Sequence, residues 1–260
     1  MQKIVAICYD FDKTLTPNNM QEQGLIELLG YKNSIDFWAE VDSFAEENLV
    51  ESNLAYMYFI QKRCKMLNIN KATLKSLGSK IRLYEGLESW FDSLNEYAQR
   101  NGVILEHYIL SSGLSEIIEG TKIGNKFNGI YASGYVYDEL GIPVWPKQVI
   151  NYTNKTQFLF RISKGIESPI SDSVNDVVEG KMRVPFLNMI YIGDSETDIP
   201  CMKIIQSHQG VAVGVYDENK GVNKKAEKSF LTRSIKYVPA NYKEGSILYN
   251  IVLEAIDNAK

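Results

Sequence analysis

Apolar residues along this chain gather in short runs, and each run ends at acidic, glycine or small polar residues. The first run covers residues 4–9 and ends at Asp10-Phe11-Asp12. Such runs are typical of the central strands of a parallel sheet, which are buried on both faces. By this criterion we predict four strands, at residues 4–9, 104–110, 187–192 and 210–215.

Between the strands, apolar residues recur three or four positions apart, which is the spacing of one face of an α-helix. This spacing predicts helices at about 86–100 and 156–164, so that crossover helices connect parallel strands. Residues 20–83 show helical spacing throughout. Aromatic pieces near 130–145, separated by glycines, instead predict a small antiparallel hairpin.

These patterns predict an α/β fold: a Rossmann-like parallel sheet flanked by helices, with a smaller all-helical domain. The expected α/β core comprises residues 1–16 and 84–260, including the hairpin near 130–145, and the helical domain comprises residues 17–83. The polar stretch at 167–183 has no spacing that predicts its structure.

Composition narrows the class of function. The chain has 260 residues, 45% of them hydrophobic, which is enough to form a large core. Its net charge of −4 provides no broad positive field, so we expect a small-molecule ligand and neither nucleic acid nor membrane as a partner. The three cysteines lack metal-ligand spacing, and no apolar run is long enough to cross a bilayer. We therefore expect a soluble cytoplasmic protein, of an oligomeric state that the sequence does not predict.

Asp10 and Asp12 stand at the end of the first predicted strand. Residues two apart on an extended chain point the same way, so both carboxylates should project beyond the strand, where open α/β sheets bind their ligands. Carboxylates this close repel each other unless a cation or a shared proton compensates. A hard divalent ion such as Mg²⁺ is the natural partner. Taken alone, however, an Asp-x-Asp pair is more often a solvated turn or a helix cap.

Three later segments place further polar groups at strand ends or helix starts. The first follows the second predicted strand, and its hydroxyls and amides suit phosphate oxygens, although a plain helix cap would look the same. The second is a lysine that opens a helix after a polar turn. The third has an acid at a strand end and another acid one helical turn further on. In order, they are Ser111-Ser112-Gly113, Lys155, and Asp194 with Asp198.

Together, in this order, the four segments resemble the signatures of the haloacid dehalogenase-like hydrolase superfamily: Asp-x-Asp-x-Thr, a strand-terminal Ser or Thr, a lysine, and Gly-Asp-x-x-x-Asp. The match extends from about residue 4 to about residue 215. Residues 17–83 look like the helical cap that phosphoserine phosphatase-like members carry between the first and second motifs. The resemblance implies a magnesium-dependent phosphatase that acts on a small phosphorylated metabolite.

The resemblance also implies a role for each motif residue. Asp10 would be the nucleophile that forms an aspartyl-phosphate, and Asp12 would be the general acid and base. Asp12 favours phosphoryl transfer over dehalogenation, because the carbon–halogen members lack an acid there. Thr14 would brace the loop, and Asp198 would orient Lys155 or a metal-bound water. The other implied roles are Mg²⁺ binding by Asp10, the Asp12 carbonyl and Asp194, and phosphate binding by Ser111, Ser112, Gly113 and Lys155.

Several alternatives stay open at this point. The interval between Lys155 and Gly193 is longer than in compact members of the family. Lys147 and Lys164 are therefore alternatives to Lys155 as the motif lysine. A phosphotransferase or mutase would use the same aspartyl-phosphate, and a phosphate-sensing regulatory protein would keep the site without turnover. Within the cap, Glu22, Lys62 and Arg63 are candidates for reading an amine or carboxylate of the substrate, although solvated helix charges would look the same.

Overall fold

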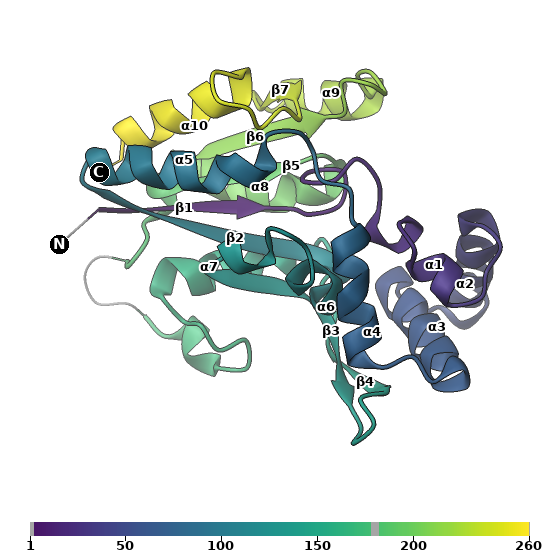
Figure 1. Cartoon of the computed structure of the whole chain (residues 1–260). Coiled ribbons are helices and arrows are strands. Elements are labelled where there is room, and N and C mark those ends of the chain that lie inside the picture. Colours follow the sequence, from purple (N-terminus) through teal and green to yellow (C-terminus); the bar gives the residue numbers. More distant parts are fainter. Residues whose placement is uncertain (1–2, 178–181, 260) are drawn as a thin grey trace.

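Seven strands form one sheet in the order β4-β3-β2-β1-β5-β6-β7 (Figure 1). The computed structural model describes residues 3–177 and 182–259. Neighbouring strands are parallel, except that β3 and β4 pair antiparallel. The predicted α/β fold with a largely parallel sheet is confirmed. The strands are β1 (Lys3–Tyr9), β2 (Val103–Leu114), β3 (Gly129–Tyr137), β4 (Pro143–Gln148), β5 (Met189–Gly193), β6 (Val211–Tyr216) and β7 (Lys236–Pro239).

Helices cover both faces of the sheet. Val5, Ile7 and Tyr9 of β1 pack in one cluster with α5 and α10, whereas Ala6 and Cys8 pack in a second cluster with α7, α8 and α9. Figure 1 shows α5 and α10 on one side of the sheet and α7 on the other. Burial on both faces explains why β1 is an uninterrupted apolar run. The helices are α5 (Leu87–Arg100), α6 (Ser115–Glu119), α7 (Lys155–Lys164), α8 (Ile199–Ser207), α9 (Lys224–Leu231) and α10 (Ile247–Asp257).

Residues 17–83, which we call the helical insertion, contain helices and turns and lie beyond the carboxyl end of β1 (Figure 1). Three of the helices begin at a side chain that accepts the backbone N–H three residues on, namely Asn33, Glu51 and Asn70. The elements are α1 (Leu25–Leu28), α2 (Ser34–Asn48), α3 (Ser52–Leu67) and α4 (Lys71–Ser76), with 3₁₀ turns at Met20–Glu22 and Leu77–Lys80.

The sheet differs from the prediction at its edges. β3 pairs with β2 as well as with β4, so the hairpin extends the main sheet and is not appended beside it. β7 was not predicted, because it has only four residues and begins with a lysine and ends with a proline. The unassigned stretch 167–183 contains a 3₁₀ turn at Asp172–Asn175, and its residues 178–181 lie outside the described residues. None of the helices in the described part of the chain has the length and apolarity to span a membrane.

A buried chain of hydrogen bonds anchors the last residue of β1. Trp90 Nε1 donates to the Tyr9 hydroxyl (2.9 Å), which lies 3.0 Å from Nδ1 of His107. The amide oxygen of Asn95 can only accept, so Nε2 of His107 donates to it (3.2 Å), and in the neutral ring Nδ1 then accepts the hydrogen bond of the Tyr9 hydroxyl. Burial lowers the pKa of His107 to about 3, so this ring is neutral. The chain joins β1, β2 and α5 directly before Asp10.

Replacing Tyr9 with Phe should lower the free energy of unfolding by about 2 kcal/mol, because Trp90 and His107 would each lose a partner in the core. Urea unfolding followed by circular dichroism measures the loss. Tyr97→Phe is the matched control, since the Tyr97 hydroxyl bonds Asp257 at the surface and its removal should cost less. Equal losses in the two variants would show that the buried chain contributes no more than a surface contact.

Candidate active site

Three neighbouring strands end at one edge of the sheet and bring the predicted residues together. Asp10 follows β1, Ser111 lies near the end of β2, and Asp194 follows β5. Asp10 lies between the other two, because β1 lies between β2 and β5 in the sheet. The N–H of Asp10 donates to the carbonyl of Ile192 (2.9 Å) and so continues the pairing of β1 with β5.

Lys155 reaches this edge from the first turn of α7. Its Nζ lies 2.8 Å from Oδ1 of Asp10 and 2.9 Å from Oδ1 of Asp198, and the side chain is only 3% exposed. Lys164, at the other end of α7, donates to two backbone carbonyls instead. Lys147 belongs to the edge strand β4. Of the three lysines that the sequence left open, Lys155 is the one that contacts the acids.

Asp198 is buried, and three donors surround its carboxylate. Oδ1 accepts hydrogen bonds from Lys155 and from the Tyr191 hydroxyl (2.8 Å), and Oδ2 accepts the N–H of Ser195 (3.3 Å). This geometry suits a residue that orients Lys155. Tyr191 was not among the residues predicted for the site, although the alternation of side chains along β5 places it on the same face as Gly193, the last residue of the strand.

Positive charge among these carboxylates is scarce. Burial raises the pKa of Asp10 to about 6 despite the nearby Lys155, and burial together with Asp10 raises the pKa of Asp12 to about 7. Burial, Asp198 and Asp10 raise the pKa of Asp194 well above its usual range. Burial alone would lower the pKa of Lys155, but Asp10 and Asp198 outweigh it and raise the pKa, so the ammonium stays charged.

The acids form a donor set that fits a divalent cation. One carboxylate oxygen each from Asp10, Asp194 and Asp198 lie within 4.8 Å of one another. Oxygen ligands suit Mg²⁺, and its charge would offset the burial and the mutual repulsion that raise the pKa values of the acids. Asp198 already accepts three hydrogen bonds, which leaves Asp10 and Asp194 as the better ligands. The backbone carbonyl of Asp12 as a third ligand stays a prediction.

The predicted phosphate-binding residues lie in a bulge of β2, whereas the sequence predicted them beyond its end. Ser111 and Leu114 pair with consecutive residues of β3, so Ser112 and Gly113 bulge out of the ladder. The hydroxyl oxygen of Ser111 accepts the N–H of Gly113 (3.0 Å). The strand continues through this segment because Leu114 returns to the sheet, a long-range pairing that small polar residues do not signal.

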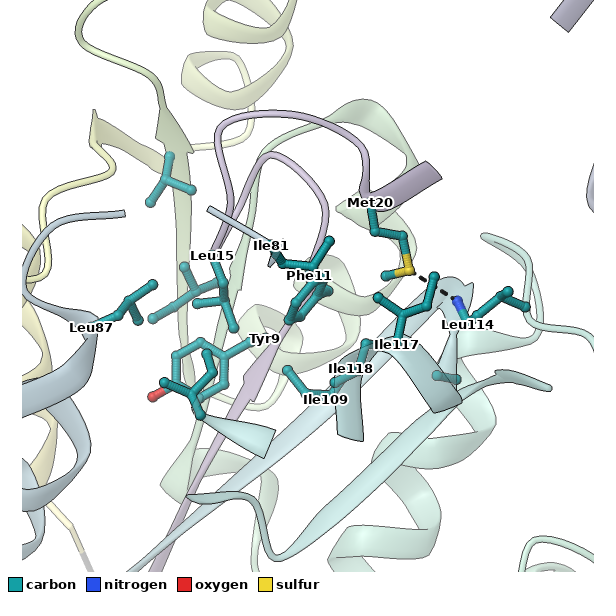
Figure 2. Close-up of a cluster of buried hydrophobic side chains, with 14 of the residues drawn as sticks. Tyr9, Phe11, Leu15, Met20, Ile81, Leu87, Ile109, Leu114, Ile117 and Ile118 are labelled. Atoms are coloured by element: carbon teal, nitrogen blue, oxygen red, sulfur yellow. Dashed lines mark hydrogen bonds between the residues drawn. The ribbon is translucent and has the colours of Figure 1, made fainter. Parts of the chain in front are cut away.

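The helical insertion contacts the same segment. The N–H of Met20 donates to Oδ1 of Asp12 (2.6 Å), and the Met20 sulfur accepts the N–H of Leu114 (3.2 Å), as Figure 2 shows. The Tyr56 hydroxyl donates to the carbonyl of Ser112. Met20 and Tyr56 were not predicted as site residues, because in a helical pattern an apolar or aromatic residue looks like any core position.

Thr14 supports the loop through its main chain. Its carbonyl accepts a hydrogen bond from the Tyr242 hydroxyl (2.6 Å), whereas its buried Oγ1 has no hydrogen-bond partner among the described residues. A brace at Thr14 therefore runs through its carbonyl and the Tyr242 hydroxyl, and among the described residues no hydrogen bond of its side chain adds to it.

The charged candidates of the insertion are engaged elsewhere. Arg63 pairs with Glu40 (3.7 Å), and Lys62 lies over two aromatic rings of its own helix. Glu22 is exposed and accepts a hydrogen bond from Asn19 (2.9 Å). In this structure none of the three contacts Asp10 or Asp12.

Solved structures share this arrangement of elements. A HAD family hydrolase from Salmonella enterica subsp. enterica serovar Typhi matches 97% of this chain and 71% of its own, with a TM-score of 0.62 and 16% identity. A phosphoserine phosphatase in the form of a phospho-aspartyl intermediate analogue matches 96% of this chain and 98% of its own (TM-score 0.56, 15% identity). This chain has the haloacid dehalogenase-like (HAD-like) fold.

Two further proteins are similar to this chain with the HAD-like fold. Cytosolic 5'-nucleotidase IIIB bound to cytidine matches 98% of this chain and 86% of its own (TM-score 0.58, 14% identity). An uncharacterized protein of Borreliella burgdorferi (strain ATCC 35210 / DSM 4680 / CIP 102532 / B31) is 28% identical over 285 aligned positions, covering 98% of this chain and 97% of that protein. No protein-family model matches the chain.

The raised pKa values predict how Mg²⁺ affects stability. A carboxyl group whose pKa is higher in the folded than in the unfolded state stabilises the fold at pH values below its unfolded pKa. This stabilisation is lost as the pH rises, here between about pH 4 and pH 7 for Asp10 and Asp12. Mg²⁺ should therefore raise the unfolding temperature more at about pH 8 than at about pH 5. Asp194→Asn should remove most of this response.

Scanning fluorimetry in MgCl₂ measures the shift, with NaCl of equal ionic strength as the control. A response of the same size at both pH values, or one retained by Asp194→Asn, would contradict the assigned cation site.

Proposed function

We propose that this protein is a magnesium-dependent phosphatase that hydrolyses a small phosphomonoester through an aspartyl-phosphate on Asp10. One observation carries the proposal: the buried contact of Lys155 with Asp10 and Asp198, at a sheet edge that also carries Asp12. The phosphoserine phosphatase of the same fold, whose structure is that of a phospho-aspartyl intermediate analogue, supports it. A cytoplasmic location stays a prediction from the sequence.

In the proposed reaction, Asp10 attacks the phosphorus atom and Asp12 protonates the leaving oxygen. Lys155 keeps the buried Asp10 ionised and holds its Oδ1, 2.8 Å from Nζ. A pKa of about 7 suits Asp12, because both its acid and its base form are then populated near neutrality. In the second step Asp12 takes a proton from the water that attacks the aspartyl-phosphate, which releases phosphate and regenerates Asp10.

Donors around Asp10 would bind the transferring phosphoryl group. The Ser111 hydroxyl and the Ser112 amide would donate hydrogen bonds to its oxygens, and Lys155 would add a positive charge. The Gly113 amide would join them by giving up its bond to the Ser111 oxygen. Asp10, Asp194 and the Asp12 carbonyl would hold Mg²⁺, which supplies further positive charge against the same oxygens. Phosphoryl transfer needs little beyond this positioning and charge.

We infer that the helical insertion, residues 17–83, acts as a cap on a catalytic core made of residues 1–16 and 84–260. Asp10 is only 7% exposed, and the insertion places Met20 and Tyr56 on the β2 bulge. A cap in this position would shield the reaction from bulk water and would select the leaving group.

Asp10→Asn should reduce phosphate release from an aryl phosphate in Mg²⁺ by at least about a thousandfold, because an amide cannot act as the nucleophile. Asp12→Asn should reduce it by about a hundredfold to ten-thousandfold through loss of proton transfer. A malachite-green assay of released phosphate measures both effects. Asp42→Asn, an exposed acid on α2, is the matched control and should keep full activity.

The products separate the competing functions. If Asp10→Asn stays active, the nucleophile assignment is wrong. Phosphate that moves to an added alcohol and not to water would indicate a transferase or mutase. Phosphate binding without turnover of any monoester in a broad panel would indicate a sensor, in which Asp12 would have no proton to transfer.

A further inference from the structure

Met20 lies where the proposed acid–base residue meets the β2 bulge. Its N–H donates to Oδ1 of Asp12 (2.6 Å), and its sulfur accepts the N–H of Leu114 (3.2 Å; Figure 2). A methyl group built on Gly113 would lie 2.2 Å from Cε of Met20 and 3.2 Å from Oδ2 of Asp12. The end of the Met20 side chain therefore fills the space that a Cβ at position 113 would need, and the thioether, the bulge and the carboxylate lie next to one another.

The surroundings of the Met20 side chain are apolar. It is fully buried and belongs to a hydrophobic cluster that includes Phe11, Ile81 and Ile117 (Figure 2). A methionine side chain is unbranched and flexible, so it can repack when a ligand enters. A ligand beside Asp12 would therefore meet a movable and uncharged wall.

The apolar surface of Met20 bears on the reaction because Asp12 is assigned to proton transfer. The inference therefore rests on the proposed function. The N–H of Met20 occupies Oδ1 of Asp12, which leaves Oδ2, the oxygen beside Gly113, to protonate the leaving group. The ester oxygen must then come within hydrogen-bond distance of Oδ2. The atoms attached to that oxygen consequently lie against Met20 and Gly113.

We infer that Met20 is a specificity-determining residue, which selects phosphomonoesters whose leaving group is uncharged and apolar beside the ester oxygen. A thioether contributes dispersion contacts to such a group. It gives nothing to an ammonium group, which is strongly disfavoured in a buried site unless a carboxylate faces it.

The acids of this region do not supply that carboxylate. Asp12 is protonated when it acts as the acid, Asp10 and Asp198 contact Lys155, and Asp194 is assigned to the cation. Glu22 is exposed and engaged by Asn19. Glu116 is buried, but it accepts hydrogen bonds from neighbouring groups on the hairpin side, the Ser115 hydroxyl and the N–H of Tyr135.

Propyl phosphate and 2-aminoethyl phosphate test the inference, because they have the same size and differ by a methyl against an ammonium group. The wild-type protein in Mg²⁺ should prefer propyl phosphate by at least about tenfold in kcat/KM. Met20→Glu places a carboxylate against the ammonium group and should shift this ratio by at least about tenfold toward 2-aminoethyl phosphate. Met20→Leu keeps the apolar wall and should keep the wild-type ratio.

Two further variants complete the experiment, one as a control for the added charge and one as a substitute for Met20→Glu. Met66→Glu introduces the same charge at an exposed position of α3 and should leave the ratio unchanged. If Met20→Glu is not folded by circular dichroism, Met20→Gln serves instead: its neutral carbonyl accepts a hydrogen bond from the ammonium group and should shift the ratio by about threefold in the same direction.

Different results would overturn the proposed function and the inference about Met20. If the wild-type protein releases phosphate from no monoester, the proposed function is wrong. If it is active but hydrolyses 2-aminoethyl phosphate as well as propyl phosphate, the inference about Met20 is wrong and the function stands. An unchanged ratio in folded Met20→Glu would overturn the inference in the same way.

Discussion

The buried contact of Lys155 with Asp10 and Asp198 is the interaction on which the rest of this site depends. A buried ammonium group is strongly unfavourable without carboxylates, and buried carboxylates are unfavourable without a cation, so each makes the burial of the others possible. The contact joins the end of β1, the start of α7 and the turn after β5. The negative charge that Lys155 leaves uncompensated, that of Asp194 included, is what a divalent cation would neutralise.

A second set of contacts attaches the helical insertion to the sheet. The Tyr135 hydroxyl on β3 donates to the carbonyl of Met57 (2.7 Å), and the N–H of Lys71 donates to the carbonyl of Gly141 between β3 and β4 (2.8 Å). With the contacts to the β2 bulge, these bonds hold the insertion independently of its two chain connections. In the proposed cap role, an insertion that moves to admit a substrate would have to break these bonds, which would link the hairpin to access to Asp10.

The elements that were predictable have a local signal. β1, β5 and β6 are buried on both faces and therefore read as apolar runs, and Asp10 and Asp194 follow such runs directly. β3 mixes tyrosines and glycines and so lacks a continuous apolar run, and its place in the main sheet, between β2 and β4, was missed. The end of β2 was missed because Ser112 and Gly113 have the composition of a loop, although Leu114 rejoins the ladder.

By itself, the sequence determined the α/β class, the helical insertion and the order of the acids, since these follow from periodicity and from positions next to strand ends. It left three lysines open and marked neither Met20 nor Tyr191. Only the tertiary structure shows which lysine contacts the acids, because Lys155 and Asp10 are 145 positions apart in the sequence. Contact between such distant residues depends on the order of the strands and on what else is buried with them. Neither can be inferred from the residues that are adjacent in the sequence.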